Sequence, residues 1–337
     1  MPRRSTCEKP IARRLVLGSA LPCLAAAGSG PAAAQTEAPF PSRPVTMLVG
    51  FAPGGGTDVA ARLLAPRLQA RFGQPVAVEN RTGASGTIAA VATARARPDG
   101  HVVTLGTVSG NVLAPLMLRP PPFEPVADLT PIALVATVPL VMAVPAPSPA
   151  RDVAGFVAML RENPGRLNFA SNGPGTSQHL AAELFMQATG TEMVHVPYRG
   201  SGPATIDLIA GAVSVNFDTL SSVLPHIRQG TLRGLGVTTA RRSPQVPELP
   251  TIAESGVPGY DIDVWYMLYG PPGMPAPTVA RWADAVGQAL AEPEVRQRLG
   301  EAGFDVGHGS PADAAALVRA EVARYGDVVR RANVRLD

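Results

Sequence analysis

The segment that decides the fold reads FAPGGGTD, residues 51–58. It follows the apolar run VTMLVG (45–50) and precedes DVAARLLAPRLQARF (58–72), whose apolar residues recur at helical spacing. A short apolar run bounded by turn residues indicates a buried strand, and the longer periodic pattern indicates a helix. Glycines at the junction let the backbone turn sharply and approach a ligand closely. The segment is therefore expected to join a strand to a helix.

The same alternation continues along the N-terminal half of the chain. Strands are expected at 45–51, 76–80 and 101–107, with helices at 58–72 and 87–96. Strands that alternate with helices in this way predict a parallel sheet with helices on both faces.

The pattern restarts after residues 138–149. In this second unit we expect helices at 152–163, 177–190, 203–212 and 221–230, and strands at 167–171, 192–198, 213–218 and 232–239. The C-terminal segments 277–303 and 311–333 are amphipathic helical patterns with no strands of their own, so we expect them to return and cover the first unit. The prediction is an α/β fold of two lobes, joined by two crossings with a ligand cleft between them. The first lobe is expected to comprise 43–140 plus 262–337, and the second 141–261.

Residues 1–34 have the layout of a cleavable signal peptide: a basic start, an apolar run at 15–27 and small residues before Gln35. Arg13 and Arg14 are also compatible with twin-arginine export. This segment holds five of the 29 basic and one of the 26 acidic residues, so 24 basic and 25 acidic residues remain, a net charge of −1. That balance gives no reason to expect a nucleic-acid partner.

The signal peptide also contains Cys7, Cys23 and the single lysine, Lys9. The exported chain would therefore have no disulfide, thiolate metal site, cysteine nucleophile or Schiff-base lysine. The longest remaining apolar stretch, 131–145, is interrupted by Pro139 and is too short to cross a bilayer. These features predict a periplasmic location.

Two more segments repeat the order strand, glycine turn, helix: NRTGASGTIAA (80–90) and FASNGPGTSQHLAAE (169–183). Helix N-termini carry unpaired N–H groups and partial positive charge, and they bind anions. The alternative is that all three are ordinary strand-to-helix turns. The chain has no GxxxxGK[ST] loop, and the opening glycines do not complete GxGxxG, so a small carboxylate is the favoured anion.

An enzyme is the main alternative. The segment GTVSGN (106–111) is not a GxSxG elbow, and no HExxH motif occurs. A secreted hydrolase acting on a small carboxylate or ester would use Ser109 or Ser177 with His195 and an aspartate. A lone strand histidine is more often structural. A third class, an adhesive or structural protein, would lack a closing cleft.

Several long motifs then occur in one order. They read FPSRPVTMLVGFAPGGGTD, VENRTGASGTIAA, ARPDGHVVTLGT, LTPIA, NFASNGPGTSQHLAAELF, HVPYRGSGPATIDLIAG, a long segment that begins FDTLSSVLPHIRQG, and WYMLYGPPGMP. With these motifs the chain resembles the tripartite tricarboxylate transporter substrate-binding receptors, also called the Bug family, over nearly the whole exported chain.

The resemblance implies a type II periplasmic binding protein that closes on a small organic acid, amino acid or related metabolite. It implies no catalytic residue, metal or cofactor. The expected partner is a membrane permease of the tripartite tricarboxylate type or a sensor kinase, and the receptor is expected to act as a monomer.

The resemblance also implies ligand-binding positions in both lobes. In the first lobe they are Phe51, Ala52, Gly54, Gly55, Thr57, Asp58, Ala84, Ser85, Gly86, Thr107, Ser109 and Asn111. In the second they are Gly175, Thr176, Ser177, His195, Tyr198, Gly200 and Asp218. One departure is Met267, where the family usually has a small residue, and its bulk is expected to reshape the distal pocket.

Overall fold

The computed structural model describes residues 40–307 and 309–332. The predicted signal peptide, residues 1–34, lies outside these residues, and so does His308. Within the described ranges, no helix has both the length and the apolar character needed to span a bilayer.

The first part of the sheet is built around β1 (Val45–Val49). This strand pairs in parallel with β2 (Val76–Asn80) and with β3 (Val102–Thr107). Helices α1 (Gly56–Phe72) and α2 (Thr87–Ala94) connect these strands. A parallel strand covered on both faces needs a continuous apolar run, which explains the composition of β1. The expected βαβαβ unit is confirmed.

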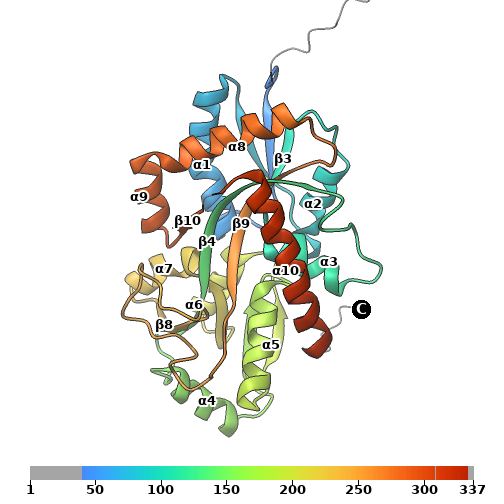
Figure 1. Ribbon diagram of the computed structural model, residues 1–337. Helices are drawn as coiled ribbons and strands as arrows, with labels where there is room; N and C mark the ends of the chain where they lie inside the picture. Colours follow the sequence, from blue (N-terminus) through green and yellow to red (C-terminus); the bar gives the residue numbers. More distant parts are fainter. Residues whose placement is uncertain (1–39, 308, 333–337) are drawn as a thin grey trace, which may run out of the picture. The chain divides into compact units, whose positions relative to one another are not determined.

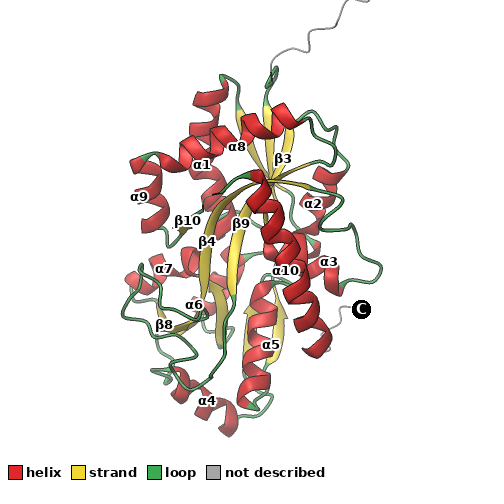
Figure 2. Ribbon diagram, in the orientation of Figure 1, coloured by secondary structure: helices red, strands yellow, loops and turns green. Residues whose placement is uncertain are grey.

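A second parallel group lies further along the chain, with β5 (Asn168–Ser171) between β6 (Val194–Pro197) and β7 (Val215–Thr219). The same part of the chain contains α4 (Val153–Glu162), α5 (Ser177–Thr189), α6 (Ser201–Ile209), α7 (Leu220–Arg228) and β8 (Leu232–Val237), a strand that pairs antiparallel with β4. The elements expected from the sequence are therefore present, with ends that differ by a few residues. Figure 2 shows helices and strands interleaved in both groups.

Two long strands join the groups (Figure 1). The first half of β4 (Thr130–Pro145) pairs with β9 (Asp263–Gly270) and with the short β10 (Asp305–Val306), and its second half pairs with β7 and β8. The main strand order is β2-β1-β3-β9-β4-β7-β5-β6. Strand β4 carries the chain into the second lobe and β9 returns it, which makes the two crossings. The residue limits of the lobes stay a prediction.

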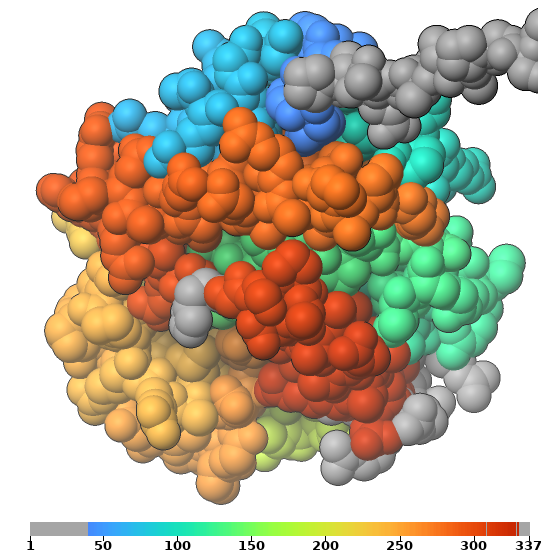
Figure 3. Space-filling view, turned by 45° about the horizontal axis from the view of Figure 1, so that its top comes forward, coloured from blue at the N-terminus to red at the C-terminus, as the bar shows by residue number. Residues whose placement is uncertain are grey.

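The C-terminal helices pack on the first lobe. They are α8 (Ala276–Ala291), α9 (Pro293–Glu301) and α10 (Pro311–Ala332). Trp282 of α8 is fully buried; its ring meets that of Phe72 edge-on at 4.7 Å, and its Nε1 donates to the Gly100 carbonyl at 3.1 Å. In Figure 3 the orange surface of α8 lies against the blue surface of α1.

Candidate functional site

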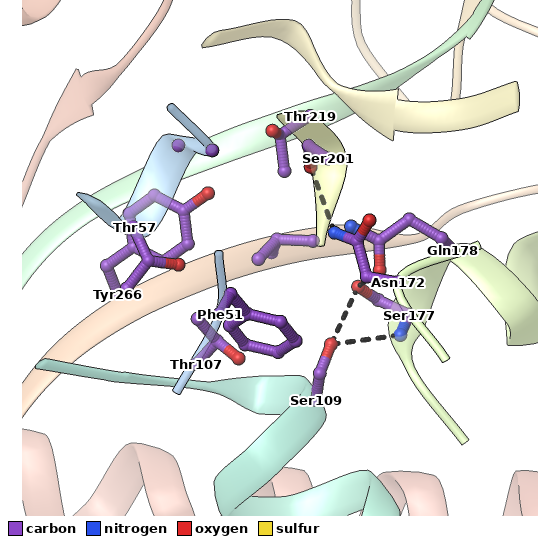
Figure 4. Close-up of a pocket in the computed structure, with 13 residues that line it drawn as sticks. Phe51, Thr57, Thr107, Ser109, Asn172, Ser177, Gln178, Ser201, Thr219 and Tyr266 are labelled. Atoms are coloured by element: carbon purple, nitrogen blue, oxygen red, sulfur yellow. Dashed lines mark hydrogen bonds between the residues drawn. The ribbon is translucent and has the colours of Figure 1, made fainter. Parts of the chain in front are cut away.

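In the described part of the chain, four helices begin around one small cavity, whose lining residues are drawn in Figure 4. Helix α1 comes from the first lobe, and α5, α6 and α7 come from the second. The first residues of each helix, or the residue that caps it, line the cavity. Their backbone N–H groups and helix dipoles therefore act on the same small volume.

The cavity lining is polar but uncharged. It consists of Phe51, Gly55, Gly56, Thr57, Thr107, Ser109, Asn172, Ser177, Gln178, Ser201, Thr219, Val264 and Tyr266. Hydroxyls, amides and one phenol can donate hydrogen bonds here. A bound anion would be held by these neutral groups instead of by a counter-ion.

The glycine loop is fixed from behind by Asp58. This carboxylate accepts from the Gly54 amide at 3.1 Å, from Arg62 at 2.9 Å and from Asn80 at 2.9 Å. Burial acts to raise the pKa of Asp58, but these three hydrogen bonds outweigh it and lower the pKa. Gly54 itself has φ of 82°, which a side chain would strain. Asp58 therefore shapes the loop and does not line the cavity.

The two lobes touch directly at the cavity. The Oγ atoms of Ser109 and Ser177 are 3.0 Å apart, and the Ser177 N–H also donates to the Ser109 Oγ at 3.0 Å. The Gly56 N–H donates to the Ser222 Oγ at 3.2 Å. Only about 20 Å³ of free volume is left between the walls, enough for about one water molecule. An organic acid can enter only after the lobes separate.

Asp218 lies fully buried behind the cavity wall. Its Oδ1 accepts from the Ser201 hydroxyl at 2.7 Å, the Thr219 N–H at 2.7 Å and the Gln178 Nε2 at 3.4 Å. Burial raises the pKa of Asp218, against the opposing effect of these hydrogen bonds. Because the three donors to Oδ1 all line the cavity, Asp218 orients the wall.

A larger pocket of about 510 Å³ adjoins the cavity. It shares Phe51 and Asn172 with the cavity and is also lined by the turn Ala84–Gly86 (η1), by Tyr198 and by Arg199. Ala84 and Ser85 have φ of 44° and 57°, a left-handed conformation that is uncommon for residues with a side chain. Such strain often accompanies functional loops.

His195 belongs to a ring stack in the second lobe. Its ring lies 4.3 Å from that of His179 and 4.8 Å from that of Phe169, and its Nε2 is 2.6 Å from the Ser171 Oγ. Burial, together with the neighbouring His179, lowers the pKa of His195 to about 4. The Gly175 N–H donates to the His179 Nδ1 at 3.2 Å, so this stack supports the loop that begins α5.

The structure distributes the predicted site residues over three places. Those on the cavity are Phe51, Gly55, Thr57, Thr107, Ser109 and Ser177. Those on the adjoining pocket are Ala84, Ser85, Gly86 and Tyr198, with Phe51 again. Those that line neither are Ala52, Gly54, Asp58, Asn111, Gly175, Thr176, His195, Gly200 and Asp218. Ligand contact by any of them stays a prediction.

Sequence reasoning missed seven lining residues: Gly56, Asn172, Gln178, Ser201, Thr219, Val264 and Tyr266. Ser201 and Thr219 follow strands at the start of helices, so the logic applied to the glycine turns could have found them. Val264 and Tyr266 gave no such signal, because they lie inside the strand β9, on alternate positions, and not at a strand-to-helix turn.

The same alternation corrects the expectation for Met267. Successive residues of a strand point to opposite faces, so Met267 faces away from the cavity that Tyr266 lines. Met267 is fully buried and lines neither the cavity nor the adjoining pocket.

Known proteins are similar to this chain in sequence and in fold. An uncharacterised-family protein encoded between tcbD and tcbE in Pseudomonas sp. (strain P51) is 39% identical over 318 residues, which covers 94% of this chain and 93% of that protein. The solved structure of R. palustris Rpa4515 with adipate is 38% identical with a TM-score of 0.85, covering 88% of this chain and 99% of that one. MatC from Rhodopseudomonas palustris with bound malate is 34% identical with a TM-score of 0.83, covering 86% and 100%.

The two-lobed α/β fold is thus the fold of periplasmic binding proteins, as expected from the sequence. Residues 60–334 match the model of the tripartite tricarboxylate transporter family receptor. This match covers most of the chain and includes α1 from Ala60 onward, both crossing strands and the helices α8, α9 and α10. The chain therefore belongs to the tripartite tricarboxylate transporter receptor family.

Proposed function

We propose that this protein is an extracytoplasmic receptor that closes on a small carboxylate, with the carboxylate head group in the cavity and the rest of the ligand in the adjoining pocket. The observation that carries the proposal is the meeting of four helix N-termini at a cavity with no charged side chain in its lining. Their combined positive potential favours an anion. The neutral lining offers a cation no counter-ion.

The related structures support a carboxylate as the anion. One of these proteins was solved with adipate and the other with bound malate, which are both small carboxylic acids. At 38% and 34% identity, these proteins are close enough for the chemistry of the head group to be carried over as part of the proposal.

Ligand binding and lobe closure form one equilibrium in this proposal. Donors from both lobes line the cavity, so a carboxylate in contact with both stabilises the closed state over the open one. The direct bonds between Ser109 and Ser177 would help to hold that closed state. The strands β4 and β9 are the natural hinge because the chain crosses between the lobes there.

The location and partner are part of the same proposal. The family is named for a transporter receptor, which favours the periplasm and a membrane permease of the tripartite tricarboxylate type. A sensor kinase that reads the closed lobes is the second candidate partner.

The hydrolase alternative is not favoured by the geometry. A serine nucleophile needs a histidine base within hydrogen-bond reach. The hydroxyls of Ser109 and Ser177 bond to each other, and the Ser177 hydroxyl also donates to Gln178. His195 bonds instead to Ser171 and stacks on His179. No histidine bonds to either serine among the described residues.

The test is a thermal-shift screen of residues 35–337, refolded to remove any carried ligand. The panel contains mono-, di- and tricarboxylates, amino acids, aromatic acids and the carboxamide of each acid. A ligand at 100 times its Kd should add about 2.7 kcal/mol to the free energy of unfolding. Hits are then titrated by calorimetry and recovered for chromatography.

We expect at least one acid to bind, its carboxamide to bind more weakly, and the recovered ligand to be unchanged. A screen in which no acid raises the melting temperature would refute the proposal. Conversion of the bound acid into a product would favour the hydrolase instead.

A further inference from the structure

Asn172 lies at the junction of the cavity and the adjoining pocket, and it lines both. It is 8% exposed. Its Nδ2 donates to the Ser201 Oγ at 2.9 Å, whereas its Oδ1 is buried with no hydrogen-bond partner among the described residues. An unpaired buried acceptor is costly, so a group that donates to it would be favoured.

The chemistry of the neighbouring groups fixes which end of the amide is the acceptor. The Ser201 hydroxyl has one hydrogen, and it donates that hydrogen to the Asp218 Oδ1 at 2.7 Å. The Ser201 Oγ can therefore only accept from Asn172, which requires the amide NH₂ at that end. Figure 4 shows this bond between Ser201 and Asn172.

The orientation does not depend on the charge of Asp218. Its Oδ1 also accepts from the Thr219 N–H at 2.7 Å and from the Gln178 Nε2 at 3.4 Å. The Oδ2 accepts one hydrogen bond among the described residues, from the Asn216 Nδ2 at 3.2 Å, so a proton on this carboxyl would reside on Oδ2, and Ser201 would still donate to Oδ1. The fully buried Asp218 thus holds Ser201, and through it Asn172, in one arrangement.

We infer that the ligand is a hydroxy carboxylate, with a hydroxyl near its head carboxylate that donates to the Asn172 Oδ1. This rests on the proposed function, because the same cavity holds the carboxylate. An ammonium could also donate, but it would be placed among four helix N-termini with no acidic side chain in the lining. A neutral hydroxyl can donate to the Asn172 Oδ1 without the electrostatic repulsion that the positive helix N-termini exert on an ammonium.

The test compares matched acids by calorimetry: succinate, malate and aspartate; glutarate, 2-hydroxyglutarate and glutamate; propionate, lactate and alanine. Within the series that binds, we expect the hydroxy acid to bind roughly 10- to 100-fold more tightly than the acid without the hydroxyl. The amino acid should bind more weakly than the hydroxy acid.

The role of the Asn172 side chain is tested with the variant Asn172→Leu. Leucine is similar in size to asparagine and has no hydrogen-bond acceptor. In this variant the Kd of the acid without the hydroxyl, divided by the Kd of the hydroxy acid, should fall towards one, whatever the two absolute values are. Asn163→Leu makes the same change at the end of α4, where Asn163 lines neither the cavity nor the adjoining pocket, and serves as the control, since it should leave that ratio unchanged. If Asn172→Leu does not fold, as judged by circular dichroism, Asn172→Ala replaces it.

Each other outcome overturns the inference. Equal binding of hydroxy and unsubstituted acids by the unaltered protein would show that Asn172 reads no hydroxyl, while the carboxylate receptor itself would stand. Tighter binding of the amino acid than of the hydroxy acid would show that the Asn172 Oδ1 accepts from an ammonium group instead of a hydroxyl. A hydroxyl preference that survives in Asn172→Leu would place the recognition elsewhere. Failure of every acid to bind would refute the proposed function and this inference together.

Discussion

Replacing Gly56 with alanine should weaken ligand binding by opposing lobe closure. Gly56 begins α1 and lines the cavity. A Cβ at this position would lie 2.3 Å from the Ser221 Oγ, 2.5 Å from the Tyr266 hydroxyl and 3.1 Å from the Thr219 Oγ1. Tyr266 is 1% exposed, so its ring has little room to move aside.

The magnitude follows from this overlap. Extra methyl groups in a packed site typically cost about 1–3 kcal/mol. Because the overlap involves Ser221 and Thr219 of the second lobe, most of this cost falls on the closed state. The Kd should therefore rise about 5- to 150-fold. The methyl group would also take up part of a cavity that has only about 20 Å³ of free volume.

The neighbouring Gly55 provides the matched control. A Cβ there would meet no atom closer than 3.6 Å, and the extended backbone, with φ of −79°, suits any residue. We would titrate Gly56→Ala and Gly55→Ala with the best acid from the screen, and measure the melting temperature of each free protein. The steric argument is refuted if Gly56→Ala keeps its affinity, or if Gly55→Ala loses as much.

Three further changes test separate parts of the structure. Ser109→Ala removes the acceptor of the Ser177 N–H across the lobes, so calorimetry should show about a tenfold higher Kd; an unchanged Kd would mean that this bond does not hold the closed state. Burial and the neighbouring His179 lower the pKa of His195 from 6.5 to about 4. The neutral ring therefore stabilises the fold above pH 6.5, and this stabilisation is lost as the pH falls towards 4. The melting temperature should drop over that window, and it should drop less in His195→Gln. Trp282→Ala should lower the free energy of unfolding by about 3–5 kcal/mol, because Trp282 is fully buried against Phe72. The urea midpoint of this variant should fall while its Kd for the ligand stays within error. A changed Kd would show that α8 influences the site.

The sequence by itself determined the local elements and their order. The apolar run 45–49 and the segment 215–219, in which Val215 and Phe217 alternate with polar residues, form buried strands, and the glycine turns at 54–56 and 173–175 lead into helices. These features depend on backbone conformation and on periodicity, which neighbouring residues specify. The same reasoning placed Gly55, Thr57 and Ser177 at one polar site, because strand-to-helix turns in such sheets meet at the same edge.

The tertiary structure alone decided how the lobes are joined and which atoms face the cavity. The long strand β4, interrupted in sequence by Pro139, and the returning β9 were not predicted as strands, because pairing between residues about 130 positions apart leaves no local pattern. The stacked rings of His179 and His195 are likewise distant in sequence. Asn172 became a specific acceptor only because Ser201 and Asp218 fix its amide from two other elements. Local preferences are written in neighbouring residues, whereas the direction and pairing of a side chain depend on groups that only the folded chain brings together.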